Sequence, residues 1–206
     1  STLTLDTLGE EGMYSVIAIS PSGCISEPSE DFEVFLSGLP EIVNITTTNA
    51  FQDQQDIIVT VQGYGVYAFQ LNDGPLQDTG HFTNVPPGTH TVMVYDITSG
   101  NINGANSCGN LPIPNIELIN YPKFFTPNGD GYNETWNITG LTAFHNAEIY
   151  IFDRYGKLLK QLNPEGEGWD GTFNGNQLPS TDYWFKVLYD EQDTRREFKA
   201  HFSLKR

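Results

Sequence analysis

Turn-forming residues divide this chain into short segments. The 206 residues include 20 Gly and 12 Pro, and with Asn and Thr they recur about every eight to twelve residues, a spacing typical of all-β proteins. The last segment is the clearest strand, because apolar and polar residues alternate from Phe198 to Leu204 and so lie on opposite faces of an extended chain. The pattern predicts an all-β fold.

Charge is distributed unevenly along the chain. The net charge is −16; residues 1–120 hold 14 Asp and Glu but no Lys or Arg, whereas residues 121–206 hold all 10 basic residues and 12 acidic ones. Because a polyanion repels phosphate, nucleic acid and anionic lipid surfaces are excluded as partners. The change in composition predicts a domain boundary near residue 112. No apolar run reaches the roughly 18 to 20 residues of a membrane-spanning helix.

An internal repeat indicates how the chain is organised. The sequence begins without Met or a signal peptide, so we expect a mature product or a piece of a longer polypeptide. The segment Gly12–Cys24 is echoed by Gly88–Gly100, each with a Gly-led turn, an alternating strand and a polar turn. A repeat of this length fits one small immunoglobulin-like sandwich. We therefore predict tandem Ig-like β-sandwich modules: residues 1–39 as the C-terminal part of a truncated repeat, residues 40–112 as a complete repeat, and residues 113–206 as a compact antiparallel sandwich.

The expected strands follow from alternation and turn signals. They are residues 2–5, 14–20, 31–36, 41–47, 56–62, 65–71, 81–85 and 89–96, then 116–125, 135–139, 146–153, 157–162, 182–190 and 196–204. Turns are expected at Leu71–Gly74, Asp153–Gly156 and Asp190–Thr194. The two prolines of Leu111–Pro114 restrict φ and favour an extended link between modules.

The two cysteines, Cys24 and Cys108, lack metal-type spacing. Two alternatives stay open: a Cys24–Cys108 bridge across the module boundary, or two modules that each hold an unpaired or elsewhere-paired cysteine. Either alternative fits an exported protein better than a cytosolic one.

No residue pattern indicates catalysis, and we expect a protein that is not an enzyme. Nucleophile-elbow, phosphate-loop and His-Glu-x-x-His patterns are absent from the sequence. The four histidines are scattered, and none stands at metal-ligand spacing.

One loop resembles a calcium-binding loop. Asn128 and Asp130 would occupy its third and fifth positions and Glu134 its ninth. However, Thr126 and Asn137 stand where carboxylates are usual. The alternative is a tight double turn in which the Asn and Asp side chains cap backbone amides.

The tryptophans Trp136, Trp169 and Trp184 all lie in residues 121–206. Exposed Trp faces stack on sugars, which makes a carbohydrate-binding module of a secreted protein the alternative function. Burial in the core is the commoner use of Trp in a small sandwich.

Four ordered sequence blocks and the carboxyl end resemble a known family. The blocks are Phe124–Trp136, Ile149–Lys157, Gly168–Gly175 and Leu178–Phe185, and the chain closes with the basic segment Phe198–Arg206. Together they resemble the type B C-terminal sorting domain of the Bacteroidetes type IX secretion system, the gliding-motility-associated C-terminal domain. Residues 40–112 are similar, more loosely, to the Ig-like adhesin repeats of such proteins.

The resemblance implies a secretion signal domain that directs a large cell-surface or secreted adhesin through the type IX system, with the Ig-like repeats as stalk or passenger. The expected location is the cell surface or the extracellular medium, reached through the periplasm and the outer membrane. The expected partners are outer-membrane components of the type IX machinery, and surface polysaccharide through the adhesin part, but no nucleic acid. No cofactor is expected apart from Ca²⁺ at Asn128, Asp130 and Glu134, if that loop binds metal.

Two groups of residues carry these implications. The translocon is expected to recognise Lys199, His201, Lys205 and Arg206. The family motif comprises Pro127, Asn128, Gly129, Asp130, Gly131, Asn133, Arg154, Tyr155, Gly156, Gly168, Trp169, Asp170, Gly171, Tyr183 and Trp184. Glu134 departs from the family pattern, which more often has Asp at this position.

Overall fold

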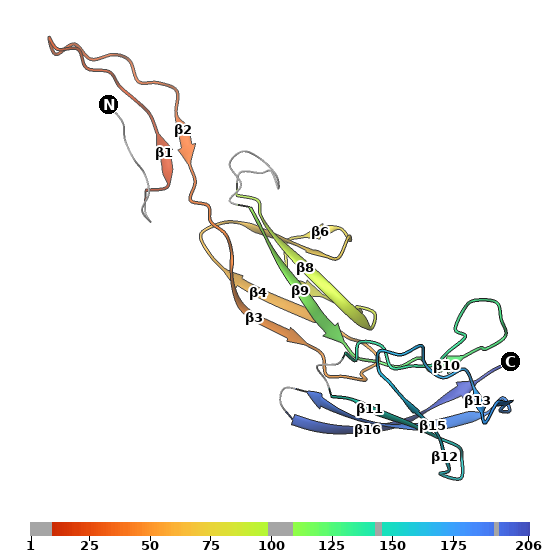
Figure 1. Cartoon of the computed structure of the whole chain (residues 1–206). Coiled ribbons are helices and arrows are strands. Elements are labelled where there is room, and N and C mark those ends of the chain that lie inside the picture. The colour runs from red at the N-terminus through yellow and green to blue at the C-terminus, as the bar shows by residue number, and fades with distance from the viewer. Residues whose placement is uncertain (1–9, 99–108, 143–145, 192–193) are drawn as a thin grey trace. The chain divides into compact units, whose positions relative to one another are not determined.

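Figure 1 shows the computed structural model, which describes residues 10–98, 109–142, 146–191 and 194–206. Every regular element among these residues is a β-strand, so the all-β prediction is confirmed. None of the described residues forms a helix long and apolar enough to span a membrane. The described chain divides into two compact units, one drawn from residues 1–46, 58–81 and 91–114 and the other from residues 47–57, 82–90 and 115–206.

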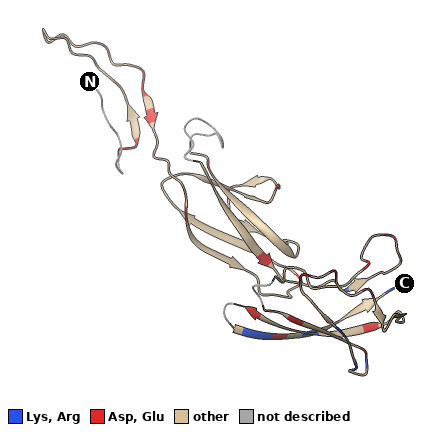
Figure 2. Cartoon of the chain, in the orientation of Figure 1, with Lys and Arg blue, Asp and Glu red and all other residues tan. Residues whose placement is uncertain are grey.

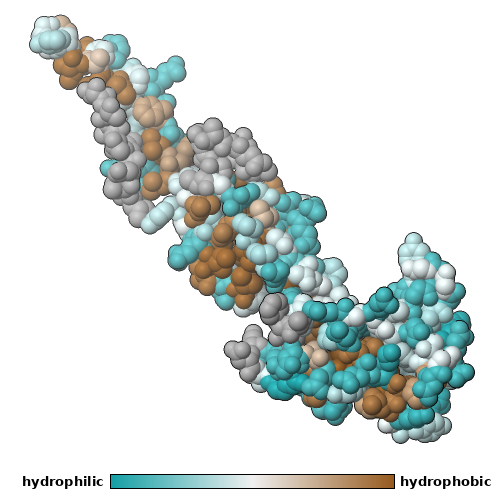
Figure 3. All heavy atoms as spheres, viewed as in Figure 1, coloured by the Kyte–Doolittle hydropathy of each residue, from teal (hydrophilic) through white to brown (hydrophobic). Residues whose placement is uncertain are grey.

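A two-stranded sheet opens the described chain. β1 (Gly12–Tyr14) and β2 (Phe32–Val34) pair antiparallel, with Gly12 opposite Val34. Of the strand expected over residues 14–20, Tyr14 ends β1 and the remainder forms only an isolated bridge between Ile19 and Ile25. The strand expected over residues 2–5 lies outside the described residues. Apolar side chains of this segment, including Met13 and Val16, are exposed, and Figure 3 shows the apolar surface that results.

Two further sheets contain the strands between residues 41 and 118. One has the order β3 (Glu41–Thr47), β4 (Ile57–Gln62), β7 (His81–Phe82). The other has the order β6 (Leu76–Gln77), β5 (Tyr67–Leu71), β8 (Gly88–Asp96), β9 (Asn110–Leu118). Burial alternates along β8, where Val92 and Val94 are fully buried. The described residues of these two sheets form seven strands, the strand content of an Ig-like sandwich.

β9 runs through the segment that we expected to be a link between modules. The chain is extended there, as the prolines require, but it belongs to a sheet. β9 forms the edge of that sheet, and an edge strand is where proline, which has no amide to donate, is tolerated. Pro112 and Pro114 therefore mark an edge strand.

A five-stranded sheet organises the second unit. Its order is β10 (Phe124–Phe125), β16 (Thr194–Leu204), β15 (Asp182–Glu191), β11 (Glu148–Phe152), β12 (Leu158–Leu162). A small separate hairpin pairs β13 (Thr172–Phe173) with β14 (Asn176–Gln177). β15 and β16 pair antiparallel along their whole length, from Asp182–Ser203 to Glu191–Thr194. β10 pairs with β16 in parallel, which no local pattern had indicated.

Aromatic side chains fill the core of this unit. Phe202 stacks on Trp136 with ring centroids 3.9 Å apart and planes 11° from parallel. Trp169 meets Tyr183 edge-on, with centroids 5.0 Å apart. Such pairs stabilise a fold beyond the area that they bury, so the aromatic content of residues 121–206 serves mainly to hold this core together.

The segment between β3 and β4 also contributes to this core. Phe51 stacks on Phe198 with centroids 4.1 Å apart, and its amide donates to the carbonyl of Ile119 at 2.8 Å. The Asn120 side chain donates to the carbonyl of Gln52 at 2.7 Å. The second unit therefore includes residues far upstream of the boundary that we placed near residue 112, and that boundary stays a prediction.

Two expected turns are confirmed by their hydrogen bonds. The amide of Gly156 donates to the carbonyl of Asp153 at 3.0 Å, and the amide of Gly74 to that of Leu71 at 2.9 Å. The third turn includes residues 192–193, and the Cys24–Cys108 pairing includes Cys108; both lie outside the described residues.

The strand expected over residues 135–139 was wrong. Trp136 and Thr139 make only isolated bridges, to Trp169 and Asn120. Their segment is a loop whose apolar residues pack into the core, and such residues mimic strand alternation. β6, β13 and β14 were missed because two residues are too few to show a period.

Candidate functional site

The last strand presents its polar residues to solvent. β16 buries Phe202 and Leu204 and exposes Lys199 and His201, so the alternation expected from the sequence is confirmed. His201 lies opposite Trp184 of β15, with the two ring centroids 6.2 Å apart. The sheet thus places two of the expected recognition residues on one face with an exposed aromatic ring.

Lys199 belongs to a small charge cluster on this face. Its Nζ lies 2.5 Å from one carboxylate oxygen of Glu197, and the Nζ of Lys186, opposite Lys199 in the sheet, lies 3.6 Å from the other. The hydrogen bond from Lys199 is the main reason that the pKa of Glu197 is lowered. Exposed pairs of this kind contribute little stability, so the lysines remain able to exchange Glu197 for another anion.

The other two expected residues have different surroundings. The Nζ of Lys205 lies 4.4 Å from the centroid of the Phe124 ring. The Arg206 guanidinium donates to the carbonyls of Leu178 and Gly171, the latter at 3.4 Å. Arg206 therefore ties the end of the chain to the third and fourth sequence blocks, a structural contact that the sequence did not reveal.

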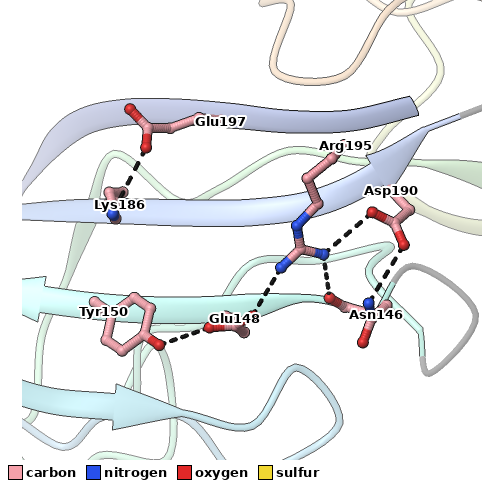
Figure 4. Close-up of polar contacts among 7 residues, drawn as sticks. All are labelled: Asn146, Glu148, Tyr150, Lys186, Asp190, Arg195 and Glu197. Atoms are coloured by element: carbon pink, nitrogen blue, oxygen red, sulfur yellow. Dashed lines mark hydrogen bonds and ion pairs between the residues drawn. The ribbon is translucent and has the colours of Figure 1, made fainter.

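Arg195 organises a second group of charges on the same sheet (Figure 4). It donates to Glu148 at 2.8 Å, to Asp190 at 3.2 Å and to the carbonyl of Asn146 at 2.6 Å. Figure 2 shows that the basic residues lie in the C-terminal elements. Sequence reasoning missed Lys186 and Arg195 because only the register of the sheet sets them beside their partners.

Hydrogen bonds involving its own side chains stabilise the loop of residues 128–134. Asp130 accepts from the amide of Tyr132 at 2.8 Å and from the Asn128 side chain at 2.9 Å. Glu134 accepts from the amide of Gly131 at 3.0 Å. The bond from the Tyr132 amide, followed by that from Asn128, lowers the pKa of Asp130 below its ordinary value of 3.8.

This arrangement has the features of the capped double turn. The described residues contain no group of three or more His, Cys, Asp or Glu side chains placed to hold a metal ion. Ca²⁺ binding by Asn128, Asp130 and Glu134 therefore stays a prediction, and the hydrogen bonds of the loop account for its shape without a metal.

The tryptophans have two kinds of surroundings. Trp136 and Trp169 are buried, and their indole N–H groups donate to the carbonyls of Pro122 and Thr172, each at 2.8 Å. Core use is confirmed for these two, which present no face to a sugar. Trp184 is 42% exposed and lies on the solvent face of the sheet.

Glycines of the third block allow close packing. A Cβ on Gly171 would lie 2.4 Å from Leu204, and one on Gly168 would lie 2.7 Å from the carbonyl oxygen of Trp136. The block therefore packs against both the first block and the last strand, which explains why glycine stands at these positions.

The second, third and fourth blocks border a cavity of about 410 Å³. It is lined by Asp153, Arg154, Tyr155, Lys157, Leu159, Phe173, Leu178, Pro179, Thr181 and Tyr183. Arg154 donates to the Thr181 hydroxyl at 2.9 Å, and the Nζ of Lys157 lies 4.5 Å from the centroid of the Phe173 ring. Burial raises the pKa of the Tyr183 phenol, and the positive charges of Arg206 and Arg154 oppose this shift.

Comparisons with known proteins identify the C-terminal segment. Residues 119–204, less than half of the chain, match the family model CHU_C, a type IX secretion signal domain. The match confirms the resemblance carried by the four blocks. No curated protein matches the chain. Among solved structures, the chain is similar to the FN1–FN3 domains of chicken CNTN1, with 10% sequence identity, a TM-score of 0.22 and coverage of 92% of this chain and 75% of that one. At so low a similarity, the fold class rests on the strands and sheets themselves.

Proposed function

We propose, from the premise that residues 119–204 are a type IX secretion signal domain, that this domain directs the export of the whole chain from the cell. A signal of this type implies export and interaction with the secretion machinery. We place the exported chain at the cell surface or in the medium. Its Ig-like repeats would be the stalk or passenger of a gliding-motility-associated adhesin from a member of the Bacteroidetes.

The chemistry of the last strand supports this proposal best. β16 keeps one face in the aromatic core and leaves Lys199 and His201 in solvent, so a receptor can read side chains without unfolding the domain. Extended segments with alternating side chains are a recurrent recognition element. Because the rest of the chain is strongly acidic, this basic face is chemically distinct within it.

A comparison of repeat positions supports the passenger part of the proposal. Val16 corresponds in the repeat to Val92, and Val16 is 60% exposed whereas Val92 is 0% exposed. An apolar side chain that is buried in one copy of the repeat and exposed in the other is expected if residues 1–39 belong to an incomplete repeat. Tandem repeats of this kind suit a stalk, because each adds length without adding a new fold.

Reporter export tests the proposed address. A periplasmic reporter fused to residues 113–206 is expected at the surface or in the medium of a host with a type IX system. A second fusion with residues 40–206 keeps the segment around Phe51, so failure of the shorter fragment to fold can be recognised. Export of a full-length fusion that lacks residues 113–206 would refute the assignment.

Charge reversal tests the expected recognition face. Lys199→Glu with Lys205→Glu keeps the buried alternation of β16, so we expect a folded domain that holds the reporter in the periplasm. Lys123→Glu with Lys160→Glu is the matched control, because it makes the same charge change at two side chains that do not belong to β16. Normal export of the first variant would show that the signal is read elsewhere, with the turns at Gly168–Gly175 and Asn128–Glu134 as the next candidates.

A carbohydrate-binding role remains the second candidate, and the exposure of Trp184 favours it. The chain would then bind glycans on an array, and Trp184→Ala would abolish binding while the thermal unfolding midpoint stays unchanged. Absence of glycan binding by the unaltered chain would remove this candidate.

A further inference from the structure

The cavity between the Asp153–Gly156 turn and the segment of residues 173–183 has the volume and the lining of a ligand-binding site. Its volume of about 410 Å³ lies within the range of roughly 300 to 1,000 Å³ that ligand pockets occupy. Three separate sequence blocks supply its lining, and only the fold brings them together. Leu159, Phe173 and Tyr183 form an apolar wall, in which the Tyr183 hydroxyl is satisfied by the carbonyl of Pro179 at 2.8 Å.

A β-bulge supplies part of this wall. Ile151 lies opposite Lys160 and Phe152 opposite Leu158, so Leu159 is an extra residue in β12. Bulges re-aim side chains and are over-represented beside functional sites. The position of Leu159 on the cavity is therefore set by the sheet.

Two cations border the cavity without a carboxylate partner. Arg154 contacts the Thr181 hydroxyl and Lys157 lies over the Phe173 ring, and neither forms an ion pair within the part of the chain that the structure describes. Of the other eight basic side chains, five form ion pairs among the described residues: Lys123, Lys186, Arg195, Arg196 and Lys199. In a chain with a net charge of −16, unpaired cations beside apolar surface favour an anionic ligand.

The hydrogen bonds of the Asp153–Gly156 turn indicate which class of anion the cavity can bind. Phosphate sites commonly use successive backbone amides as donors. Here the amides of Tyr155 and Lys157 already donate to the Asp153 carboxylate, at 2.8 and 2.9 Å. The charged donors at the cavity are the side chains of Arg154 and Lys157, which lie next to apolar walls. This arrangement suits a carboxylate carried on an apolar ligand.

We propose that this cavity binds an acidic–aromatic peptide segment of a partner protein. A carboxylate of the segment pairs with Arg154 and Lys157, and a neighbouring aromatic side chain packs against Leu159 and Phe173. The identification of the partner as a component of the export machinery rests on the proposed function. The chemistry of the peptide follows from the residues that line the cavity.

Peptide binding to the 206-residue chain tests the site. The probe is a fluorescein-labelled hexapeptide with blocked ends, Gly-Glu-Phe-Asp-Phe-Gly. Two control peptides replace either both acids by their amides or both Phe by Ser. We expect anisotropy titrations to show at least about tenfold weaker binding for each control peptide, and amide chemical shifts to change in residues 153–159 and 173–183. Equal binding of the amide peptide, or displacement of the probe by inorganic phosphate, would overturn the proposed ligand class.

Matched variants locate the binding to this cavity. Arg154→Gln with Lys157→Gln is expected to weaken probe binding at least about tenfold. Lys123→Gln with Arg196→Gln makes the same charge change elsewhere and should leave the affinity unaltered. Thermal unfolding confirms that both variants fold. Unchanged affinity in the first variant would overturn the site.

Export of the same variants separates this inference from the proposed function. If the unaltered chain carries the reporter out and the Arg154→Gln, Lys157→Gln variant retains it in the periplasm, the cavity takes part in recognition. If that variant no longer binds the probe peptide and is still exported normally, the proposed secretion signal is retained, and the proposal that the cavity takes part in export is refuted. If the unaltered chain does not export the reporter, the proposed function fails whatever the peptide does.

Discussion

At the scale of single residues, two glycines illustrate different demands on the backbone. Gly131 has φ of 87° and nothing within 4 Å of a Cβ built on it. Gly168 has φ of 90°, and its Cβ would lie 2.7 Å from a backbone oxygen of Trp136. At residue 131, only the positive φ of the backbone requires glycine. At residue 168, the positive φ and the lack of room for a Cβ both require it.

Alanine substitutions should separate these demands. We expect Gly131→Ala to lower the free energy of unfolding by about 1 kcal/mol, the cost of a left-handed conformation. Gly168→Ala should cost about 2–4 kcal/mol, because the backbone must also shift to relieve the contact. Urea unfolding measures both. Gly38→Ala is the control, since Gly38 does not have a positive φ and nothing lies within 4 Å of a Cβ built on it. Equal losses at residues 131 and 168 would contradict the close approach.

The Asp130 carboxyl should titrate below its ordinary pKa of 3.8. Because the fold favours the carboxylate, its stabilising contribution is present above the unfolded pKa and is lost as the pH falls through the lower folded pKa. An NMR titration of the side-chain carboxyl measures this directly. Asn128→Ala should move the pKa back toward 3.8 without reaching it, because the stronger bond from the Tyr132 amide remains. A titration midpoint at or above 3.8 in the unaltered chain would show that the loop hydrogen bonds are absent in solution.

At the scale of elements, β16 gives neighbouring residues opposite roles. Phe202 is 1% exposed and lies among Trp136, Trp169 and Phe185. His201, one position earlier, faces solvent. The two-residue period of a strand makes this difference unavoidable once one face is buried.

Alanine substitutions at adjacent positions test this division. Phe202→Ala should cost about 3–5 kcal/mol of unfolding free energy, whereas His201→Ala should change it by no more than about 0.5 kcal/mol. Chemical denaturation measures the pair, and loss of cooperative unfolding in Phe202→Ala would count as the same result. Comparable effects of the two changes would mean that β16 is not half-buried as described.

At the scale of the whole molecule, residues distant in sequence complete one core. Phe51 stacks on Phe198 and meets Tyr189 edge-on with centroids 5.5 Å apart. The carboxylate of Asp53 lies 3.2 Å from the Nζ of Lys123. The C-terminal unit therefore uses a segment that residues 113–206 alone do not contain.

Fragments test how far the C-terminal module is independent. We expect the fragment of residues 113–206 to unfold at a lower temperature than the fragment of residues 40–206, because it lacks the Phe51 segment. Phe51→Ala in the longer fragment should reproduce most of the loss, about 3–5 kcal/mol for a buried aromatic ring, and Leu76→Ala is the exposed control. Scanning calorimetry gives the midpoints. Equal midpoints for the two fragments would instead support full independence beyond residue 112.

Local pattern alone determined several features of this protein. The all-β class, the bounds of β3, the turn at Asp153–Gly156 and the two faces of β16 all follow from periodicity and turn chemistry, which act within a few residues. The ordered sequence blocks likewise identified the secretion signal domain later matched at residues 119–204.

Tertiary structure decided the rest. The parallel pairing of β10 with β16, the place of Phe51 in the C-terminal core, the contacts of Arg206 and the cavity between Arg154 and Tyr183 all join residues far apart in sequence. No local pattern encodes them, because register and packing are set by the combined contacts of whole segments. The sequence thus determined which residues of β16 face inward, and the fold determined which side chains they meet.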